Sequence, residues 1–125
     1  MIRLTALTSI VPLLLAAPLL AQNAELSGLV SDPSQRAVVN AVVVVQSLET
    51  GVTRAVLSNQ QGEYSVPALI PGTYSVAVEA IGFKAIHQTD VVVEVGQRAR
   101  LDFSLSVGSK SEIVTVRGVA PLLNT

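Results

Sequence analysis

Reactive side chains are few in this sequence, and their types limit the chemistry available to it. The chain holds one histidine, His87, and no cysteine. A zinc site would have to combine His87 with carboxylates alone, which is not the usual ligand set of structural or catalytic zinc. A Ser-His-Asp triad is formally available from His87 with Asp90 or Asp102, yet no serine lies in a nucleophile-elbow motif. We therefore interpret His87 as an ordinary strand residue.

Paired carboxylates, phosphate loops and aromatic platforms are no better represented. Glu94 and Asp102 each alternate with apolar neighbours, which is typical of the solvent face of a strand. The eight glycines are scattered at turns and form no phosphate-binding loop. The aromatic residues make two pairs, Tyr64 with Tyr74 and Phe83 with Phe103, which are too few for a clear sugar-stacking platform. Stacking of an exposed Tyr64 or Tyr74 on a sugar is left open as an alternative. The sequence thus predicts no catalytic, metal-binding or cofactor-binding residue, and no enzyme.

The composition fits one small globular domain. The chain has 125 residues, of which 50% are hydrophobic and 14% are charged, so it has enough apolar side chains for a core. A chain this apolar and weakly charged is not expected to be disordered. The formal net charge is −1 and the basic residues are dispersed, which argues against nucleic acid as a partner.

The first 21 residues have the three-part pattern of a secretory signal peptide. Arg3 supplies the positive start, 10–20 is an apolar core, and Ala21 is a small residue at the expected cleavage site, with cleavage after Ala24 as the alternative. A membrane anchor is the competing interpretation, but the apolar stretch is shorter than the roughly 20 residues of a span and contains prolines. No cysteine follows the apolar core, so lipid attachment is excluded. We expect an exported protein.

From Glu25 onward the pattern is that of β-structure. Valine, isoleucine and threonine dominate, and turn residues recur about every 8–12 positions, the spacing of a β-sandwich. Seven strands are expected and no helix, in a seven-stranded antiparallel β-sandwich formed by residues 24–107. The expected strands are 25–31, 41–47, 53–58, 63–66, 74–79, 84–95 and 101–107. The nearly continuous apolar run 41–47 predicts a central strand with both faces covered.

Two further details are predicted from local pattern. The segment 67–72 holds two prolines, which are expected to end ladder pairing and to set a tight turn. In the last strand, alternation predicts that four side chains point inward together: Leu101, Phe103, Leu105 and Val107. Lys84, Arg98 and Arg100 are expected to guard the sheet edges against pairing with other chains.

The tail, residues 108–125, differs in kind from the domain. A short polar hinge at 108–111 leads into an extended segment, Glu112–Arg117, and the chain then ends in an apolar Pro-Leu-Leu sequence. An eighth strand and a disordered tail are both open interpretations of Glu112–Arg117.

Five short motifs in the domain form a recognisable pattern. They read Gly28-Leu29-Val30-Ser31-Asp32, Val39-Asn40-Ala41-Val42-Val43-Val44, Asn59-Gln60-Gln61-Gly62-Glu63-Tyr64, Leu69-Ile70-Pro71-Gly72-Thr73-Tyr74 and Gly82-Phe83. Together they resemble the carboxypeptidase regulatory-like domain over residues 24–107. Asn40 and Asn59 are mild departures, because the family often has a glycine or other small residue at the first position and aspartate at the second.

The resemblance implies a transthyretin-like (prealbumin-like) sandwich, which agrees with the expected strand count. Domains of this kind accompany enzymes and receptors as accessory modules, so the resemblance implies no peptidase activity. Some related sandwiches bind carbohydrate, which makes carbohydrate an implied partner. A stand-alone secreted binding module, with carbohydrate as its ligand, is the alternative function.

The tail carries a second resemblance. Its extended segment, followed by 120–125, is similar to the join between such a domain and the plug of a TonB-dependent outer-membrane receptor of the Oar-like type. The resemblance implies that five residues form a TonB-box-like segment: Glu112, Ile113, Val114, Thr115 and Val116. Such a segment pairs as an added strand with a TonB-type energy transducer. The expected function is thus that of a non-enzymatic N-terminal module, a fragment of a receptor, exported to the periplasmic side of the outer membrane, with the transducer or the receptor plug as partner.

Overall fold

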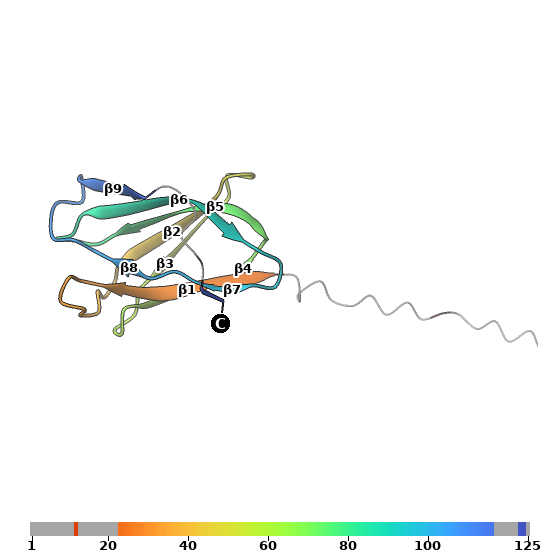
Figure 1. The fold of residues 1–125 in the computed structure, drawn as a ribbon, viewed down its shortest axis with the longest axis horizontal. Coiled ribbons are helices and arrows are strands. Elements are labelled where there is room, and N and C mark those ends of the chain that lie inside the picture. Colours follow the sequence, from red (N-terminus) through yellow and green to blue (C-terminus); the bar gives the residue numbers. More distant parts are fainter. Residues whose placement is uncertain (1–11, 13–22, 117–122, 125) are drawn as a thin grey trace, which may run out of the picture.

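Every regular element that the computed structural model describes is a β-strand (Figure 1). The structure describes residues 12, 23–116 and 123–124, so the expected signal peptide and most of the terminal Pro-Leu-Leu sequence lie outside the described residues. Within the described ranges, no helical segment has the length and hydropathy of a membrane span. The strands are β1 (Ala24–Ser31), β2 (Val42–Ser47), β3 (Thr53–Leu57), β4 (Glu63–Leu69), β5 (Gly72–Glu79), β6 (Ala85–Val93), β7 (Arg98–Arg100), β8 (Phe103–Ser104), β9 (Ile113–Val116) and β10 (Leu123–Asn124).

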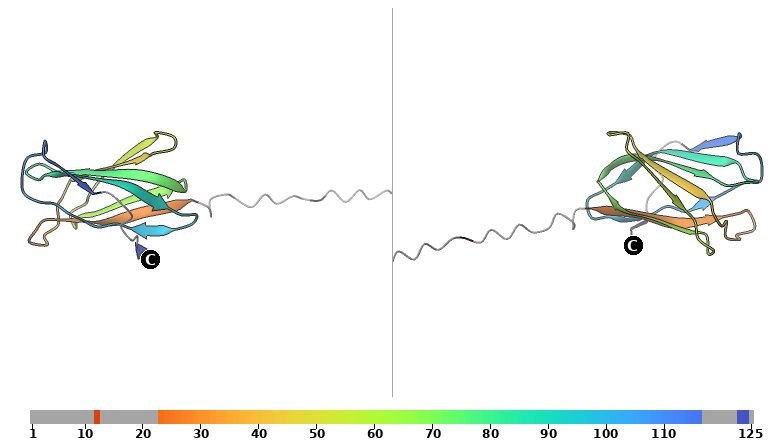
Figure 2. Two further views of the ribbon diagram at one scale, coloured as in Figure 1. Left: turned by 45° about the horizontal axis from the view of Figure 1, so that its top comes forward. Right: turned by 180° about the vertical axis from the view of Figure 1, so that it is seen from behind.

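The strands form two sheets that face each other as a sandwich (Figures 1 and 2). One sheet has the order β10-β7-β1-β4, with β8 also paired to β1, and the other has the order β3-β2-β5-β6-β9. The all-β sandwich predicted from the alternation is confirmed. It is not antiparallel throughout, because β1 pairs in parallel with β7 and β8, and β6 pairs in parallel with β9. Both sheets are therefore mixed.

The core fills the space between the sheets. In β1 buried and half-buried residues alternate along the whole strand, and Leu26 and Val30 are completely buried. The strand β2 lies between β3 and β5, as the valine run predicted, but only Val43 and Val45 face the core. The other two valines of the run are half-buried, so the expectation that both faces are covered was wrong. Among residues 23–116, no further layer covers the outer face of this sheet.

The two prolines do not bound the turn as predicted. The strand β4 continues through Pro67 to Leu69, and β5 begins at Gly72. The register against β1 shifts by one residue at this place, which marks a β-bulge, and Ala68 there has a φ of 56°. Proline is tolerated because β4 is the outer strand of its sheet and a bulge needs no regular ladder bond.

The last expected strand, 101–107, is reduced to β8 (Phe103–Ser104), and the short strand β7 (Arg98–Arg100) precedes it. Three of its four predicted inward side chains are buried, namely Leu101, Phe103 and Leu105. Val107, however, is 72% exposed, so the prediction for this residue was wrong. The chain leaves the sheet before Val107, which makes only an isolated bridge to Phe83 at the end of the sandwich.

Candidate functional site

The candidate catalytic residues of the sequence are distributed over the fold. His87 lies in β6, opposite Ala77 of β5 and Thr115 of β9. Asp90 lies further along the same strand, in a bulge where its φ is 59°. Asp102 belongs to the other sheet, between β7 and β8. In the described part of the chain, no group of three or more histidine, cysteine, aspartate or glutamate side chains is placed to hold a metal ion.

The carboxylate of Asp102 has a structural function instead. One of its oxygens, Oδ1, accepts a hydrogen bond from the backbone N–H of Leu29 at 2.8 Å and one from Nε of Arg100 at 3.2 Å. Glu94, the second carboxylate considered from the sequence, follows β6, where its backbone N–H donates to the side-chain carbonyl of Gln97 at 2.9 Å. These contacts explain Asp102 without a catalytic role.

Tyr64 contacts the chain on both sides of Asp102 from within the core. Its side chain is 3% exposed, its ring lies 6.1 Å from that of Phe103, and its hydroxyl donates to the carbonyl of Leu101. In a regular parallel ladder that carbonyl would accept from the N–H of Leu29. This carbonyl accepts from the Tyr64 hydroxyl, and the N–H of Leu29 donates to Asp102 instead. One tyrosine, one carbonyl and one carboxylate thus join β4, β1 and the β7–β8 segment.

Tyr74 is the second buried tyrosine. It is 6% exposed, and its hydroxyl donates to the carbonyl of Ile70. Both tyrosine hydroxyls therefore have partners, as is usual for buried tyrosines. The alternative in which an exposed Tyr64 or Tyr74 stacks on a sugar was wrong, because neither ring offers a free face to solvent.

The burial of Tyr64 predicts a stability loss in alkaline solution. Burial, and secondarily the charge of Asp102, raise its pKa well above the usual 10.0, with Arg100 opposing the shift. The unfolded chain therefore releases the phenol proton near pH 10 while the folded chain keeps it, so stability falls as pH rises above about 10. The slope contributed by Tyr64 approaches about 1.4 kcal/mol per pH unit. Urea unfolding at about pH 8 and about pH 11 is expected to show this decline.

The matched variant is Tyr64→Phe. At neutral pH we expect it to cost about 1–2 kcal/mol, since the carbonyl of Leu101 loses its buried donor. Above pH 10 its decline should be shallower than that of the wild type, and only the part due to Tyr74, whose pKa is also raised by burial, should remain. An equally steep decline in both proteins would contradict this origin.

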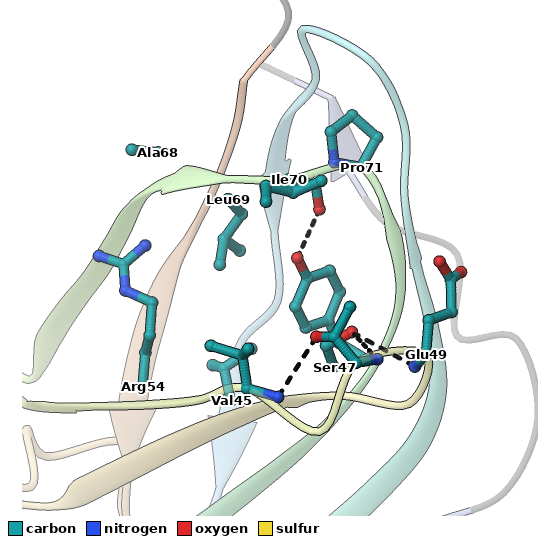
Figure 3. Close-up of a pocket in the computed structure, with 11 residues that line it drawn as sticks. Val45, Ser47, Glu49, Arg54, Ala68, Leu69, Ile70 and Pro71 are labelled. Atoms are coloured by element: carbon teal, nitrogen blue, oxygen red, sulfur yellow. Dashed lines mark hydrogen bonds between the residues drawn. The ribbon is translucent and has the colours of Figure 1, made fainter.

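A small cavity lies at the end of the sandwich where the β2–β3 turn and the β4–β5 loop diverge (Figure 3). Its volume is about 180 Å³, and its walls include Val45 and Leu69. Arg54 and Glu49 lie on opposite sides of it (Figure 3), and Arg54 donates to the carbonyl of Pro67. A cavity of this size and largely aliphatic lining suits one apolar group, which is not the chemistry of a sugar ring.

The five residues of the TonB-box-like segment come together at the outer edge of a sheet. Ile113–Val116 form β9, which pairs with the first half of β6, and all four side chains are exposed. Glu112 precedes the strand, and its carboxylate lies 3.3 Å from Nζ of Lys84. The segment is therefore extended and accessible. Lys84, which was expected to guard a free sheet edge, instead pairs with Glu112 at the start of the segment.

Sequence reasoning missed two of the residues that organise this fold. Gly28 was recognised as part of a motif, but not for its close approach to Leu101, whose carbonyl oxygen would lie 2.0 Å from a Cβ atom at this position. Lys84 was assigned to edge protection, whereas it pairs with Glu112. The signal for Gly28 was its place within a strand, since a strand glycine marks close backbone approach.

Comparison with known proteins gives two sequence relationships. Residues 25–106 match the carboxypeptidase regulatory-like domain. The chain is also 26% identical over 105 residues to the TonB-dependent transporter Oar of Myxococcus xanthus. That match covers 83% of this chain and 10% of the transporter, so the chain spans about a tenth of the length of this relative.

Solved structures show the same fold at low sequence identity. A putative carbohydrate binding protein from Bacteroides uniformis aligns with a TM-score of 0.57 and 22% identity, covering 67% of this chain and 41% of that protein. Catechol 1,2-dioxygenase from an Acinetobacter species aligns with a TM-score of 0.58 and 11% identity, covering 77% of this chain and 59% of the enzyme. These likenesses concern the sandwich alone, and proteins of different function share it.

Proposed function

Because the chain belongs to the carboxypeptidase regulatory-like domain family, we propose that it acts as a non-enzymatic accessory domain of a TonB-dependent transporter. In this proposal it works on the periplasmic side of the outer membrane and offers Glu112–Val116 to a TonB-type energy transducer. The likeness to a TonB-dependent transporter supports the class of protein. The exposed edge strand β9, placed directly after the domain, supports the mode of action.

The observation that carries the proposal is that β9 contributes its backbone, and no buried side chain, to the domain. Its four side chains are exposed, and Ile113 is 64% exposed. Recognition by strand addition takes its affinity from main-chain hydrogen bonds, for which an accessible extended segment suffices. The folded domain also needs few of the contacts of this segment, so a partner can use the segment without opening the core.

Proline substitutions at two neighbouring residues test this function. Val114→Pro and Thr115→Pro each remove one backbone N–H, on opposite edges of the strand. The variant that lacks the N–H on the edge used for pairing is expected to weaken binding of the purified C-terminal domain of a TonB-type transducer from the same organism by about ten-fold or more. Val114→Ala and Thr115→Ala keep the N–H and should bind within about two-fold of the wild type. Calorimetric titration of the full chain gives these affinities.

The same variants carry their own folding control. Since Val114 and Thr115 are exposed and lie in an edge strand, none of these substitutions should lower the free energy of unfolding by more than about 2 kcal/mol. A transducer domain that binds the wild type and both proline variants equally well would overturn recognition through this segment, as would failure to bind the wild type at all. An equal loss for alanine and proline would mean that the side chain is read instead of the backbone.

A further inference from the structure

The segment that the proposed function assigns to a partner already has a strand partner inside its own domain. Four successive register pairs join β9 to β6, from Ala85 opposite Ile113 to Gln88 opposite Val116. The N–H of Ala85 donates to the carbonyl of Glu112 at 2.9 Å. Figure 1 shows β9 lying along β6 at the outer edge of the sheet.

The contacts that hold β9 on β6 are few and solvent-accessible. None of its four side chains is buried. The ion pair between Lys84 and Glu112 has side chains that are 37% and 54% exposed, and an exposed pair of this kind contributes little stability. The attachment therefore consists mainly of main-chain hydrogen bonds at a sheet edge, which is the kind of contact that opens most readily in a folded domain.

The regular part of the β6 edge is the part that β9 covers. Beyond Gln88 the strand contains a bulge in which Asp90 has a φ of 59°, and bulges interrupt the regular pairing that an edge offers to other chains. The first half of β6, Ala85–Gln88, has no such interruption, and there β9 covers it. The domain thus uses the TonB-box-like segment to complete its own sheet.

The ladder also determines which edge of the segment is occupied. Since the carbonyl of Glu112 faces β6, the alternation of a strand turns the backbone groups of Val114 and Val116 toward β6 as well. The opposite edge carries the backbone groups of Ile113 and Thr115. Three of the five residues therefore direct their backbone groups to the edge that β6 occupies. A partner strand that pairs with this edge has to displace β6.

We propose that Glu112–Val116 exchanges between two strand partners, the edge of β6 in its own domain and a strand of the energy transducer, so that docking on β6 withholds it from the transducer. The inference rests on the proposed function and adds regulation of the same segment. Any event that loosens β9 from β6 raises the fraction of the domain that is ready to bind, because the two pairings are mutually exclusive.

A reversible disulfide across the two strands tests the exchange in the full chain. The protein has no cysteine, so the double variant His87→Cys/Thr115→Cys introduces a single pair at directly opposed positions. Opposed strand residues are close enough for a disulfide. The matched control is Val44→Cys/Ala55→Cys, which links β2 to β3 in the same sheet, away from β9.

Binding of the purified transducer C-terminal domain is measured for both double variants, oxidised and reduced. We expect the β6–β9 disulfide to weaken binding by about ten-fold or more, with full recovery on reduction, and the β2–β3 disulfide to change it by less than about two-fold. Equal binding of oxidised and reduced His87→Cys/Thr115→Cys would overturn the exchange while leaving the proposed function intact, since the transducer would then use the outer edge of β9.

Two other outcomes also decide the matter. If no disulfide forms across His87 and Thr115 under conditions in which the control pair oxidises, β9 does not dock on β6 and the inference fails. If the transducer domain binds neither the wild type nor any reduced variant, the proposed function fails and the exchange falls with it. These failures are distinguishable, because the first is detected by thiol titration without any partner.

Discussion

Replacing Gly28 by alanine is expected to destabilise the domain by about 3–5 kcal/mol, the largest effect of any single substitution considered for this fold. A Cβ atom at Gly28 would lie 2.0 Å from the carbonyl oxygen of Leu101 and 2.7 Å from its carbonyl carbon. Both atoms belong to backbone that is held in place by the N–H of Leu101, which donates to Ser27, and by the hydroxyl of Tyr64. The neighbour therefore cannot move without breaking the β1–β7–β8 connection. Urea unfolding of the purified chain measures the loss.

Gly51→Ala is the matched control. Gly51 has a φ of 76° but nothing within 4 Å of a built Cβ, so alanine there incurs only the left-handed backbone strain of about 1–2 kcal/mol. The difference between the two variants isolates the steric term. If Gly28→Ala were no less stable than Gly51→Ala, the close approach of Gly28 to Leu101 would not be a feature of the folded protein.

Ser58→Ala is expected to lower the free energy of unfolding by about 2–4 kcal/mol. Ser58 is 2% exposed, and its hydroxyl accepts from the N–H of Ala41 at 2.8 Å and donates to the carbonyl of Val38 at 2.6 Å. Alanine leaves both backbone groups without this partner inside the protein, where water cannot replace it cheaply. The measurement is again urea unfolding, with the native fold of the variant checked by its circular dichroism.

Ser47→Ala provides the comparison for this serine. Ser47 also accepts from two backbone N–H groups, those of Glu49 and Thr50, but at 3.3 Å and 3.2 Å and in an exposed turn. Water can take over these bonds, so we expect a cost below about 1 kcal/mol. Equal losses for the two serines would show that burial of the Ser58 hydroxyl does not decide its contribution.

The motif residues that carry the family resemblance prove to be mainly scaffold. Gly28 and Tyr64 come from separate motifs in the sequence, yet they meet at one carbonyl, that of Leu101. Gly28 leaves room for this carbonyl and Tyr64 supplies its donor. Their spacing therefore specifies how β1, β4 and the β7–β8 segment assemble, and it says nothing about a ligand.

Local pattern predicted most of the strands because strand formation depends on near neighbours. Alternation of apolar and polar residues placed Leu26 and Val30 of β1 in the core, and four successive valines predicted a strand at Val42–Val45. The same pattern failed at Pro67, because the tolerance of a strand for proline depends on whether that strand lies at an edge. It failed at Val107 because the strand had already left the sheet.

For the TonB-box-like segment as well, local pattern predicted the backbone conformation but not the strand partner. Residue types alone predicted an extended segment at Glu112–Arg117, and its residues Ile113–Val116 form the extended strand β9. Whether it forms an eighth strand was left open, because edge strands of this kind have no buried side chains to produce a periodic signal. The ion pair with Lys84 joins two residues that no short-range pattern connects.

Composition, alternation and motif spacing are enough to predict the fold class, the family and the position of most strands, since these depend on residues close together in the chain. Three features follow from the three-dimensional arrangement instead: the sheets are mixed, the carboxylate of Asp102 accepts from the N–H of Leu29, 73 residues away, and β9 lies on β6. Local pattern does not contain them, because main-chain hydrogen bonds are the same for every residue type. Strand partners are therefore selected by which edges the folded domain leaves open, and that selection is made in three dimensions.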